Sequence, residues 1–191
     1  TTTAIIAAAM LREHPGATII HNLIVSKAVP EVIAEGGGVA VRTRVGHSYI
    51  KAVMAEHDAL FGGEHSAHYY FADNYRADSG LIAAMVVLAE MSRSGQPLSE
   101  LRQPFERYAA SGEINSVVAD PIGTMARVEE DDMGADRDHL DGLTVDLGDW
   151  RFNLRSSNTE PLLRLNLEAA DDEAVAEHSA EVLTLIRGKE S

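Results

Sequence analysis

The stretch ATIIHNLIVSKAVPEVIAEGGGVAVRT, residues 17–43, decides the fold of the first half of the chain. It holds a short apolar run at 17–24 and a second run, VAVRT, at 39–43, and the length and composition of both are typical of strands. The pattern between them, 29–35, is helical, and the glycines at 36–38 end it. Because strand, helix and strand follow one another, the stretch predicts part of a largely parallel α/β sheet.

The same alternation continues on both sides of this stretch. Apolar residues recur at helical spacing in three further segments and gather into two more short strands. The elements expected are helices over 1–14, 47–57 and 79–92 and strands over 59–61 and 69–71. Residues 1–97 therefore predict a small mixed, largely parallel α/β layer domain.

The pattern changes in the second half of the chain. A connecting helix is expected over 99–108, inside a linker that covers 98–112. Grouped strands and a final amphipathic helix follow, with a charged irregular loop among them at 129–141. The elements expected are strands over 114–118, 143–147, 150–154 and 162–167 and helices near 125 and over 171–187. Residues 113–191 therefore predict an α+β domain with an antiparallel sheet.

Composition limits the possible partners. The 191 residues carry a formal net charge of −14, which repels nucleic acid and anionic lipid, so neither is expected as a partner. There is no cysteine and no apolar run of the roughly 20 residues that cross a bilayer, and the first residues lack a basic signal region. We therefore expect a cytoplasmic protein. Because the chain begins inside a helical pattern without Met, we also expect a processed product or a fragment.

The stretch RSSNTEPLLRLNLEA, 155–169, concentrates hydrogen-bond donors in a loop between two expected strands. Arginine can grip a phosphate through two parallel hydrogen bonds, and hydroxyls, amides and backbone N–H groups of a turn add further donors. The same residue types also suit an ordinary polar hairpin turn. The acidic background favours the anion site, for which the candidates are Arg155, Ser157, Asn158, Thr159 and Arg164.

The stretch FGGEHSAHYYF, 61–71, combines two glycines, expected to let the backbone turn sharply, with a run of polar residues. Glu64 with Ser66 suits the two adjacent hydroxyls of a sugar, and His68 can transfer a proton near neutral pH. A glycine turn with exposed polar residues is the alternative. The Glu-His-x-x-His spacing at 64–68 also suggests a zinc site. Zinc is not expected, because the related zinc motif His-Glu-x-x-His needs a helix to align its ligands and this segment leads into a strand.

Two further candidates lie at expected helix starts. His47 follows Gly46 at a position where free backbone N–H groups attract anions, although Ser48 could cap that helix instead. Lys27 follows the first strand and is expected at the same edge of the sheet as His47 and Glu64, the edge at which α/β proteins bind ligands. The acidic segment 129–138 lacks the spacing of a metal loop, so a solvated loop is favoured there over Mg²⁺ or Ca²⁺ binding. These residues together predict a two-domain protein that binds a phosphorylated polyol.

Three motifs resemble the α-D-phosphohexomutase superfamily, most closely its bacterial phosphomannomutase/phosphoglucomutase branch: VGHSYIKAVM at 45–54, GEHSAHYYF at 63–71 and RSSNTEP at 155–161. The resemblance covers the whole chain but only domains 3 and 4 of the four-domain family protein. The family's phosphorylated catalytic serine and its Mg²⁺ loop belong to domains 1 and 2, and neither motif occurs here. The resemblance thus implies a chain that is inactive without its missing N-terminal domains.

The family reaction interconverts hexose 6-phosphate and hexose 1-phosphate through a bisphosphorylated intermediate, with a hexose 1,6-bisphosphate as activator. By resemblance, mannose is the expected sugar and glucose the second. Ala67 replaces the usual glycine of the sugar loop, where a methyl group restricts positive φ. The implied roles are sugar contact for Lys27, Glu64, Ser66 and His68, substrate contact or proton transfer for His47 and His68, and binding of the non-reacting phosphate for Arg155, Ser157, Asn158 and Thr159.

Two alternatives stay open from the sequence. A non-catalytic sugar-phosphate-binding module uses the same two loops, and a phosphoglucosamine mutase fragment keeps the enzyme class with another sugar. Self-association is also expected if an apolar face lies where the second domain would pack.

Overall fold

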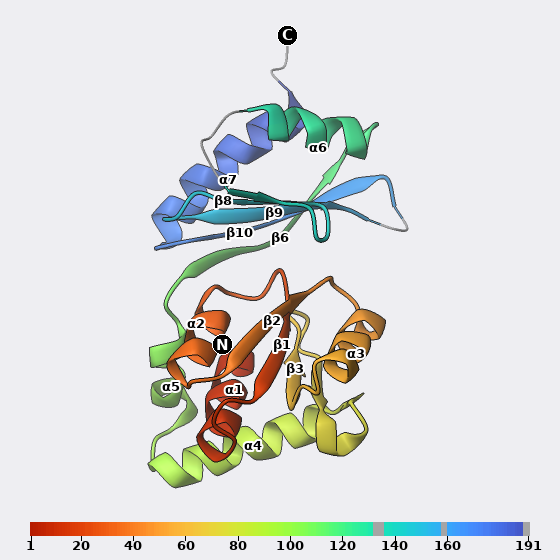
Figure 1. Cartoon of the computed structure of the whole chain (residues 1–191). Coiled ribbons are helices and arrows are strands. Elements are labelled where there is room, and N and C mark those ends of the chain that lie inside the picture. The colour runs from red at the N-terminus through yellow and green to blue at the C-terminus, as the bar shows by residue number, and fades with distance from the viewer. Residues whose placement is uncertain (132–135, 158–159, 189–191) are drawn as a thin grey trace. The chain divides into compact units, whose positions relative to one another are not determined.

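The computed structural model describes residues 1–131, 136–157 and 160–188 and divides the chain into two compact units, Thr1–Arg107 and Tyr108–Ser191 (Figure 1). Each unit has its own hydrophobic core and is described by itself. No helix among the described residues is long and apolar enough to cross a membrane.

The first unit is a three-layer α/β/α domain. Its sheet has the order β2-β1-β3-β4-β5, in which β1 runs parallel to β2 and β3, whereas β4 runs antiparallel to β3 and to β5. The elements are α1 (Thr2–Glu13), β1 (Thr18–Asn22), α2 (Ala28–Glu35), β2 (Val39–Thr43), α3 (His47–Glu56), β3 (Phe61–Gly63), β4 (Tyr69–Phe71), the short 3-10 helix η1 (Ala72–Asn74), β5 (Ala77–Asp78), α4 (Gly80–Ser94), α5 (Leu98–Leu101) and the short 3-10 helix η2 (Gln103–Phe105).

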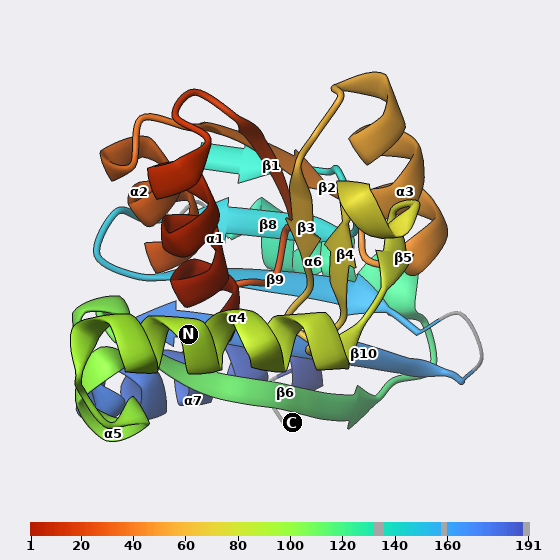
Figure 2. The same ribbon diagram turned by 90° about the horizontal axis from the view of Figure 1, so that it is seen from below.

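The core of the first unit has two parts, one on each face of the sheet, because successive side chains of a strand pack on opposite faces. Ile19 of β1 packs in the core that α1, α2 and α4 share, whereas its neighbour Ile20 packs with α3. Successive side chains of a strand point to opposite faces, so a strand of continuous apolar residues needs helices on both sides. Helices α1 and α4 also contact each other on their side of the sheet (Figure 2). Because β1, β2 and β3 are parallel, the segments that follow Asn22, Thr43 and Gly63 leave the sheet at one edge.

The second unit is an antiparallel sheet of order β6-β10-β9-β8-β7 with both helices on one face. Phe152 and Leu165 point from the sheet into this core, where they meet Val182 of the last helix. The intervening positions, among them Asn153 and Arg164, lie on the opposite, polar face. The elements are β6 (Ala109–Val117), α6 (Pro121–Glu130), β7 (Asp136–Asp138), β8 (Leu143–Asp146), β9 (Arg151–Ser156), β10 (Leu162–Ala169) and α7 (Asp172–Arg187).

The predicted fold class, a largely parallel α/β domain followed by an antiparallel α+β domain, is confirmed. The continuous helix expected over 99–108, within the linker 98–112, is wrong. Helix α5 ends at Leu101 and η2 follows, because Pro104 has no N–H group to donate to the preceding turn. Strand β6 then begins at Ala109, five residues before the expected strand.

Candidate functional site

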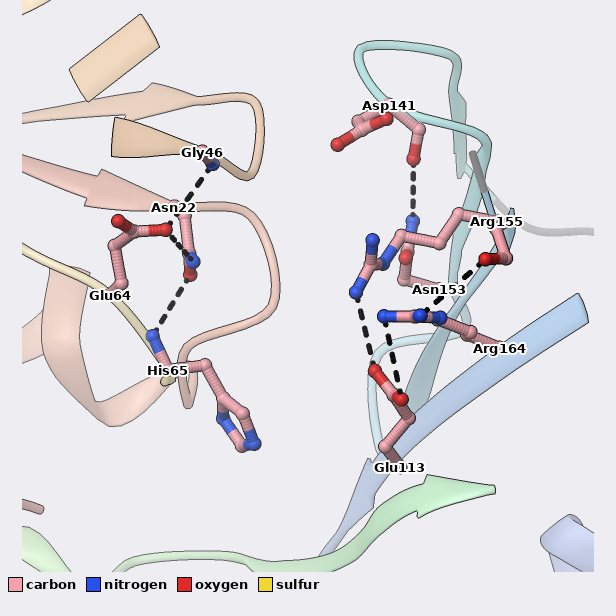
Figure 3. A network of polar contacts seen from close by, with 10 residues as sticks. Asn22, Gly46, Glu64, His65, Glu113, Asp141, Asn153, Arg155 and Arg164 are labelled. Atoms are coloured by element: carbon pink, nitrogen blue, oxygen red, sulfur yellow. Dashed lines mark hydrogen bonds and ion pairs between the residues drawn. The ribbon is translucent and has the colours of Figure 1, made fainter. Parts of the chain in front are cut away.

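The edge of the first sheet gathers residues from three segments that are distant in sequence (Figure 3). Asn22, the last residue of β1, donates from Nδ2 to Oε2 of Glu64 at 3.3 Å, and the N–H of Gly46 donates to the same oxygen at 3.2 Å. The N–H of His65 donates back to Oδ1 of Asn22 at 3.3 Å. The ends of β1 and β3 and the start of α3 are therefore tied together through one carboxyl group and one amide.

Glu64 lies at the centre of this network and is only 3% exposed. Its other oxygen, Oε1, accepts from the hydroxyl of Tyr70 at 2.6 Å. Burial raises the pKa of Tyr70, and the hydrogen bond to Glu64 raises that pKa further, so the phenol stays a donor. A carboxylate offers about four acceptor positions, of which the protein fills three. The carboxyl group is thus fixed in place before any ligand arrives.

The two glycines before Glu64 have a different role from the one expected. Both have ordinary φ values, so a sharp turn does not require them. A Cβ at Gly63 would lie 2.3 Å from Cγ2 of Thr3, and a Cβ at Gly62 would lie 3.0 Å from the sulfur of Met54. The glycines instead let α1 and α3 approach β3 closely.

The positive φ of this loop occurs at Ala67, which has φ 63°. This is the position at which the sequence places a methyl group in place of the usual glycine. Ser66 and Ala67 are both exposed, so the loop presents its tip to solvent while Glu64 anchors its base.

His68 ends the same loop and has an acidic partner that the sequence alone does not indicate. Its Nδ1 lies 2.7 Å from Oδ2 of Asp78, whose Oδ1 accepts from the N–H of Tyr69 at 2.9 Å. Burial alone would raise the pKa of Asp78, but the hydrogen bonds from His68 and Tyr69 outweigh it and hold that pKa below its usual value. An ionised Asp78 favours the proton on Nδ1 of His68 and leaves Nε2 to face a ligand. The β4–β5 pairing brings Asp78 to His68, and no short motif reveals that pairing.

The two helix-start candidates lie at the same edge of the sheet as Glu64. Lys27 is half-buried at the N-cap position of α2, the helix that follows β1. His47 is exposed as the first residue of α3, which follows β2. Gly46, not Ser48, takes the cap position there and has φ 131°. The parallel order of β1, β2 and β3 therefore brings together the segments of Lys27, His47 and Glu64, as their positions after strands indicate.

In the second unit the donor loop joins β9 and β10, which are interior strands of the sheet, so it lies at the end of the sheet where these two strands turn. Arg155 and Arg164 are direct cross-strand partners, and Nη2 of Arg164 donates to Oγ of Ser157 at 3.5 Å. Three predicted phosphate ligands, Arg155, Ser157 and Arg164, thus come from the base of one hairpin. Asn158 and Thr159 lie outside the described residues.

A neighbouring turn supports this hairpin from the side of β8. Nδ2 of Asn153 donates to the carbonyl oxygen of Asp141 at 3.0 Å (Figure 3). The same Nδ2 also donates to Oγ1 of Thr144 at 3.1 Å. A Cβ at Gly142 would lie 2.8 Å from Cα of Arg155, so the turn rests directly on the backbone of that arginine. The sequence alone does not indicate Asn153, because the role of this residue depends on strand register.

The acidic segment 129–138 lies partly outside the described residues. Within the described part of the chain, no group of three or more His, Asp or Glu side chains is placed to hold a metal ion. The described residues therefore provide no carboxylate cluster for the Mg²⁺ that the family resemblance implies for the complete enzyme.

Comparison with known proteins agrees with both units. The family model "Phosphoglucomutase/phosphomannomutase, alpha/beta/alpha domain III" matches residues 1–108, and "Phosphoglucomutase/phosphomannomutase, C-terminal domain" matches residues 113–185. A phosphomannomutase of Methanocaldococcus jannaschii is 44% identical over 184 residues, and one of Escherichia coli K12 is 40% identical over 188 residues. These alignments cover 96% and 95% of this chain but only 41% of each relative.

A solved structure of a phosphoglucomutase/phosphomannomutase family protein from Burkholderia thailandensis superposes with a TM-score of 0.82 at 27% sequence identity. The superposition covers 100% of this chain and 42% of the Burkholderia thailandensis chain. The chain thus spans about two fifths of the length of the relatives that it matches. The resemblance to the α-D-phosphohexomutase superfamily is confirmed, and the chain belongs to the phosphoglucomutase/phosphomannomutase family, of which it contains domain III and the C-terminal domain.

Proposed function

We propose that this chain is the sugar- and phosphate-binding part of an enzyme that interconverts hexose 6-phosphate and hexose 1-phosphate. Mannose is the proposed sugar and glucose the second. The observation that carries the proposal is the network at the edge of the first sheet, where Asn22, Gly46 and Tyr70 hold Glu64 at the base of an exposed loop. A fixed carboxyl group beside a solvent-facing serine and histidine suits recognition of sugar hydroxyls.

In this proposal the two units bind different parts of the substrate. Glu64, Ser66 and Lys27 hold the sugar hydroxyls, and His68 with His47 contacts the substrate near the reacting oxygen. The hairpin of the second unit holds the phosphate that is not transferred, with Arg155 and Arg164 as its cations. Holding a remote phosphate uses binding energy to position the reacting end of the substrate.

The chemical step requires groups that the resemblance places outside this chain. The phosphorylated serine and the Mg²⁺ loop belong to the first two domains of family members, and a hexose 1,6-bisphosphate is the proposed activator. We therefore expect no mutase turnover from this chain alone when it is assayed with Mg²⁺ and such an activator. Turnover at the rate of a complete family enzyme would contradict this division of labour.

The direct test is an NMR titration of the chain with mannose 6-phosphate. Saturable shifts of the amides of Gly63 to Ser66 and of Ser157 are expected, whereas inorganic phosphate should shift only Ser157 and its neighbours. The variant Ser66→Ala should weaken the response of the first loop and leave the second loop unchanged. Ser92→Ala, an exposed serine of α4, is the matched control.

The outcomes separate the possible functions. Shifts confined to the second loop would leave an anion site without sugar recognition, and no shifts in either loop would contradict the proposal. A stronger response to glucosamine 6-phosphate than to mannose 6-phosphate would favour the phosphoglucosamine mutase alternative.

A further inference from the structure

The hairpin of the second unit contains an electrostatic conflict that one residue resolves. Arg155 of β9 and Arg164 of β10 are directly opposite each other in the ladder. Like charges in this arrangement destabilise a sheet unless a counter-charge lies between them. Glu113, on the next strand β6, supplies that charge (Figure 3).

The carboxyl group of Glu113 spans both arginines. Its Oε2 lies 3.2 Å from Nη2 of Arg155, and its Oε1 lies 3.7 Å from Nη1 of Arg164. Strand β10 lies between β6 and β9, so the side chain reaches across it on the polar face of the sheet. One acidic group therefore engages, from one side, the two cations that are predicted to bind phosphate.

The charges at this place decide what happens when phosphate arrives. Two guanidinium groups and one carboxylate leave a net charge of about one positive unit. A phosphate monoester carries about −1.5 to −2 at neutral pH and prefers the same paired N–H donors of arginine that a carboxylate prefers. Glu113 and phosphate would thus repel each other while they compete for the same donors.

We propose that Glu113 is a built-in competitor of phosphate, which holds Arg155 and Arg164 in the empty site and is displaced when a phosphate dianion binds. This inference rests on the proposed function of the hairpin as a phosphate site. Competition lowers the affinity for phosphate and shortens its residence time, because affinity differences at one site act mainly through dissociation rates. Glu113 is therefore a specificity and release element of the site and not a ligand of the phosphate.

Removal of the charge tests this inference. The variant Glu113→Gln keeps the size of the side chain, and its affinity for inorganic phosphate at pH 8 should rise about ten-fold over that of the unchanged chain. The variant Glu168→Gln is the matched control, since Glu168 lies on the same face of β10 and accepts from Nε of Arg151 at 3.1 Å. This variant removes a carboxylate that pairs with a different arginine. Its affinity for phosphate should stay within two-fold of that of the unchanged chain, a difference of roughly RT or less in the free energy of binding.

A second readout needs no variant. Carbon-13 NMR of the glutamate side chains should show the carboxyl resonance of Glu113 moving as phosphate is added, while that of Glu168 stays in place. The amide spectrum of each variant, recorded before titration, shows that the sheet is folded. A purely structural role for Glu113 would instead predict weaker phosphate binding in Glu113→Gln, because the arginines would lose their anchor.

The outcomes distinguish this inference from the proposed function. Equal affinities of the unchanged chain and Glu113→Gln, equal gains in both variants, or a static Glu113 resonance would overturn the competitor role and leave the phosphate site intact. Phosphate binding by Glu113→Gln alone would support the competitor role in its strongest form. If neither the unchanged chain nor either variant binds phosphate, the phosphate site and the competitor role of Glu113 are both refuted.

Discussion

At the scale of single residues, the sugar loop carries a strained backbone position. Ala67 has φ 63°, in the left-handed region that costs an L-residue roughly 1–2 kcal/mol. The loop is closed around Ala67, because the N–H of Glu64, before Ala67, donates to the carbonyl oxygen of His68, after it, at 3.0 Å. Ala67 replaces the usual glycine of the family, and its methyl group restricts positive φ, yet the backbone adopts that conformation here.

The variant Ala67→Gly should therefore be more stable than the unchanged chain. Relief of the left-handed strain outweighs the extra freedom that glycine gives the unfolded chain, so the free energy of unfolding should rise by about 0.5–1 kcal/mol. Urea titration followed by circular dichroism measures the change. Ala89→Gly, at an exposed position of α4, is the control and should lose about 1 kcal/mol. A loss of stability in Ala67→Gly would contradict the account of strain.

The sequence predicts those candidate residues that lie close together within one short motif. Glu64, Ser66 and His68 share one loop, and Arg155 and Ser157 share another, so their proximity follows from chain connectivity. Their partners could not be predicted in this way. Asp78, Asn22 and Glu113 reach the sites through strand pairing, and the register of a pairing is set by packing across the whole sheet.

At the scale of helices and strands, the elements with strong apolar periodicity are the ones that the sequence locates well. Strand β2 has the expected bounds, and α7 begins one residue after the expected start. Strand β3 lies at Phe61–Gly63, two residues later than expected, because glycines have no side chain to show the alternation. Strand β7, Asp136–Asp138, lies inside the segment expected to be an irregular loop, because its three residues are all charged and give no strand pattern.

The contact between α1 and α4 gives a prediction about pH. Glu90 of α4 is 7% exposed and accepts from Nε and Nη2 of Arg93 at 3.1 and 2.9 Å, and from Arg12 of α1. Burial alone would raise the pKa of Glu90, but the hydrogen bonds from Arg93 and Arg12 outweigh it and hold that pKa below its usual value. The folded state therefore favours the charged form of Glu90.

A lowered pKa in the folded state gives stability that is present above the unfolded pKa, near 4.3, and is lost as the pH falls through the folded pKa. The variant Glu90→Gln should accordingly be less stable than the unchanged chain by about 1–2 kcal/mol at pH 7, and the difference should shrink below about pH 4. Chemical unfolding at a series of pH values measures this. Glu13→Gln, at an exposed position of α1, should change stability by less than about 0.5 kcal/mol at every pH. A difference for Glu90→Gln that does not depend on pH would contradict the charge-based account.

At the scale of the whole molecule, the two units have separate cores. The apolar residues of the first unit gather in two clusters on either side of its sheet, and those of the second unit form a third cluster with α6 and α7. The single tryptophan, Trp150, belongs to this third cluster and stacks on His178 with ring centroids 4.1 Å apart. Tryptophan fluorescence therefore follows the second unit alone, whereas circular dichroism follows both.

The end of the first unit is fixed by side chains that lie beyond the domain boundary expected at residue 97. Leu101 is buried, and Phe105 packs against the larger core of this unit. Arg107 donates to Glu31 at 3.0 Å and to Glu35 at 2.6 Å, both on α2. These contacts belong to the first unit, although they follow the helix α4 with which the sequence pattern ends.

Separate expression of fragments tests where the unit ends. The fragment 1–107 should fold alone and reproduce the amide NMR spectrum of its part of the whole chain, and 108–191 should do the same. The fragment 1–97 loses the burial of Leu101 and should be less stable than 1–107 by about 2–3 kcal/mol, before any contribution from Arg107 is counted. Urea titrations of the two fragments measure the difference, and the variant Arg107→Gln in 1–107 separates the ionic contacts from the apolar ones. Equal stability of 1–97 and 1–107 would mean that residues 98–107 are only a connection, so that the domain ends where the sequence pattern does.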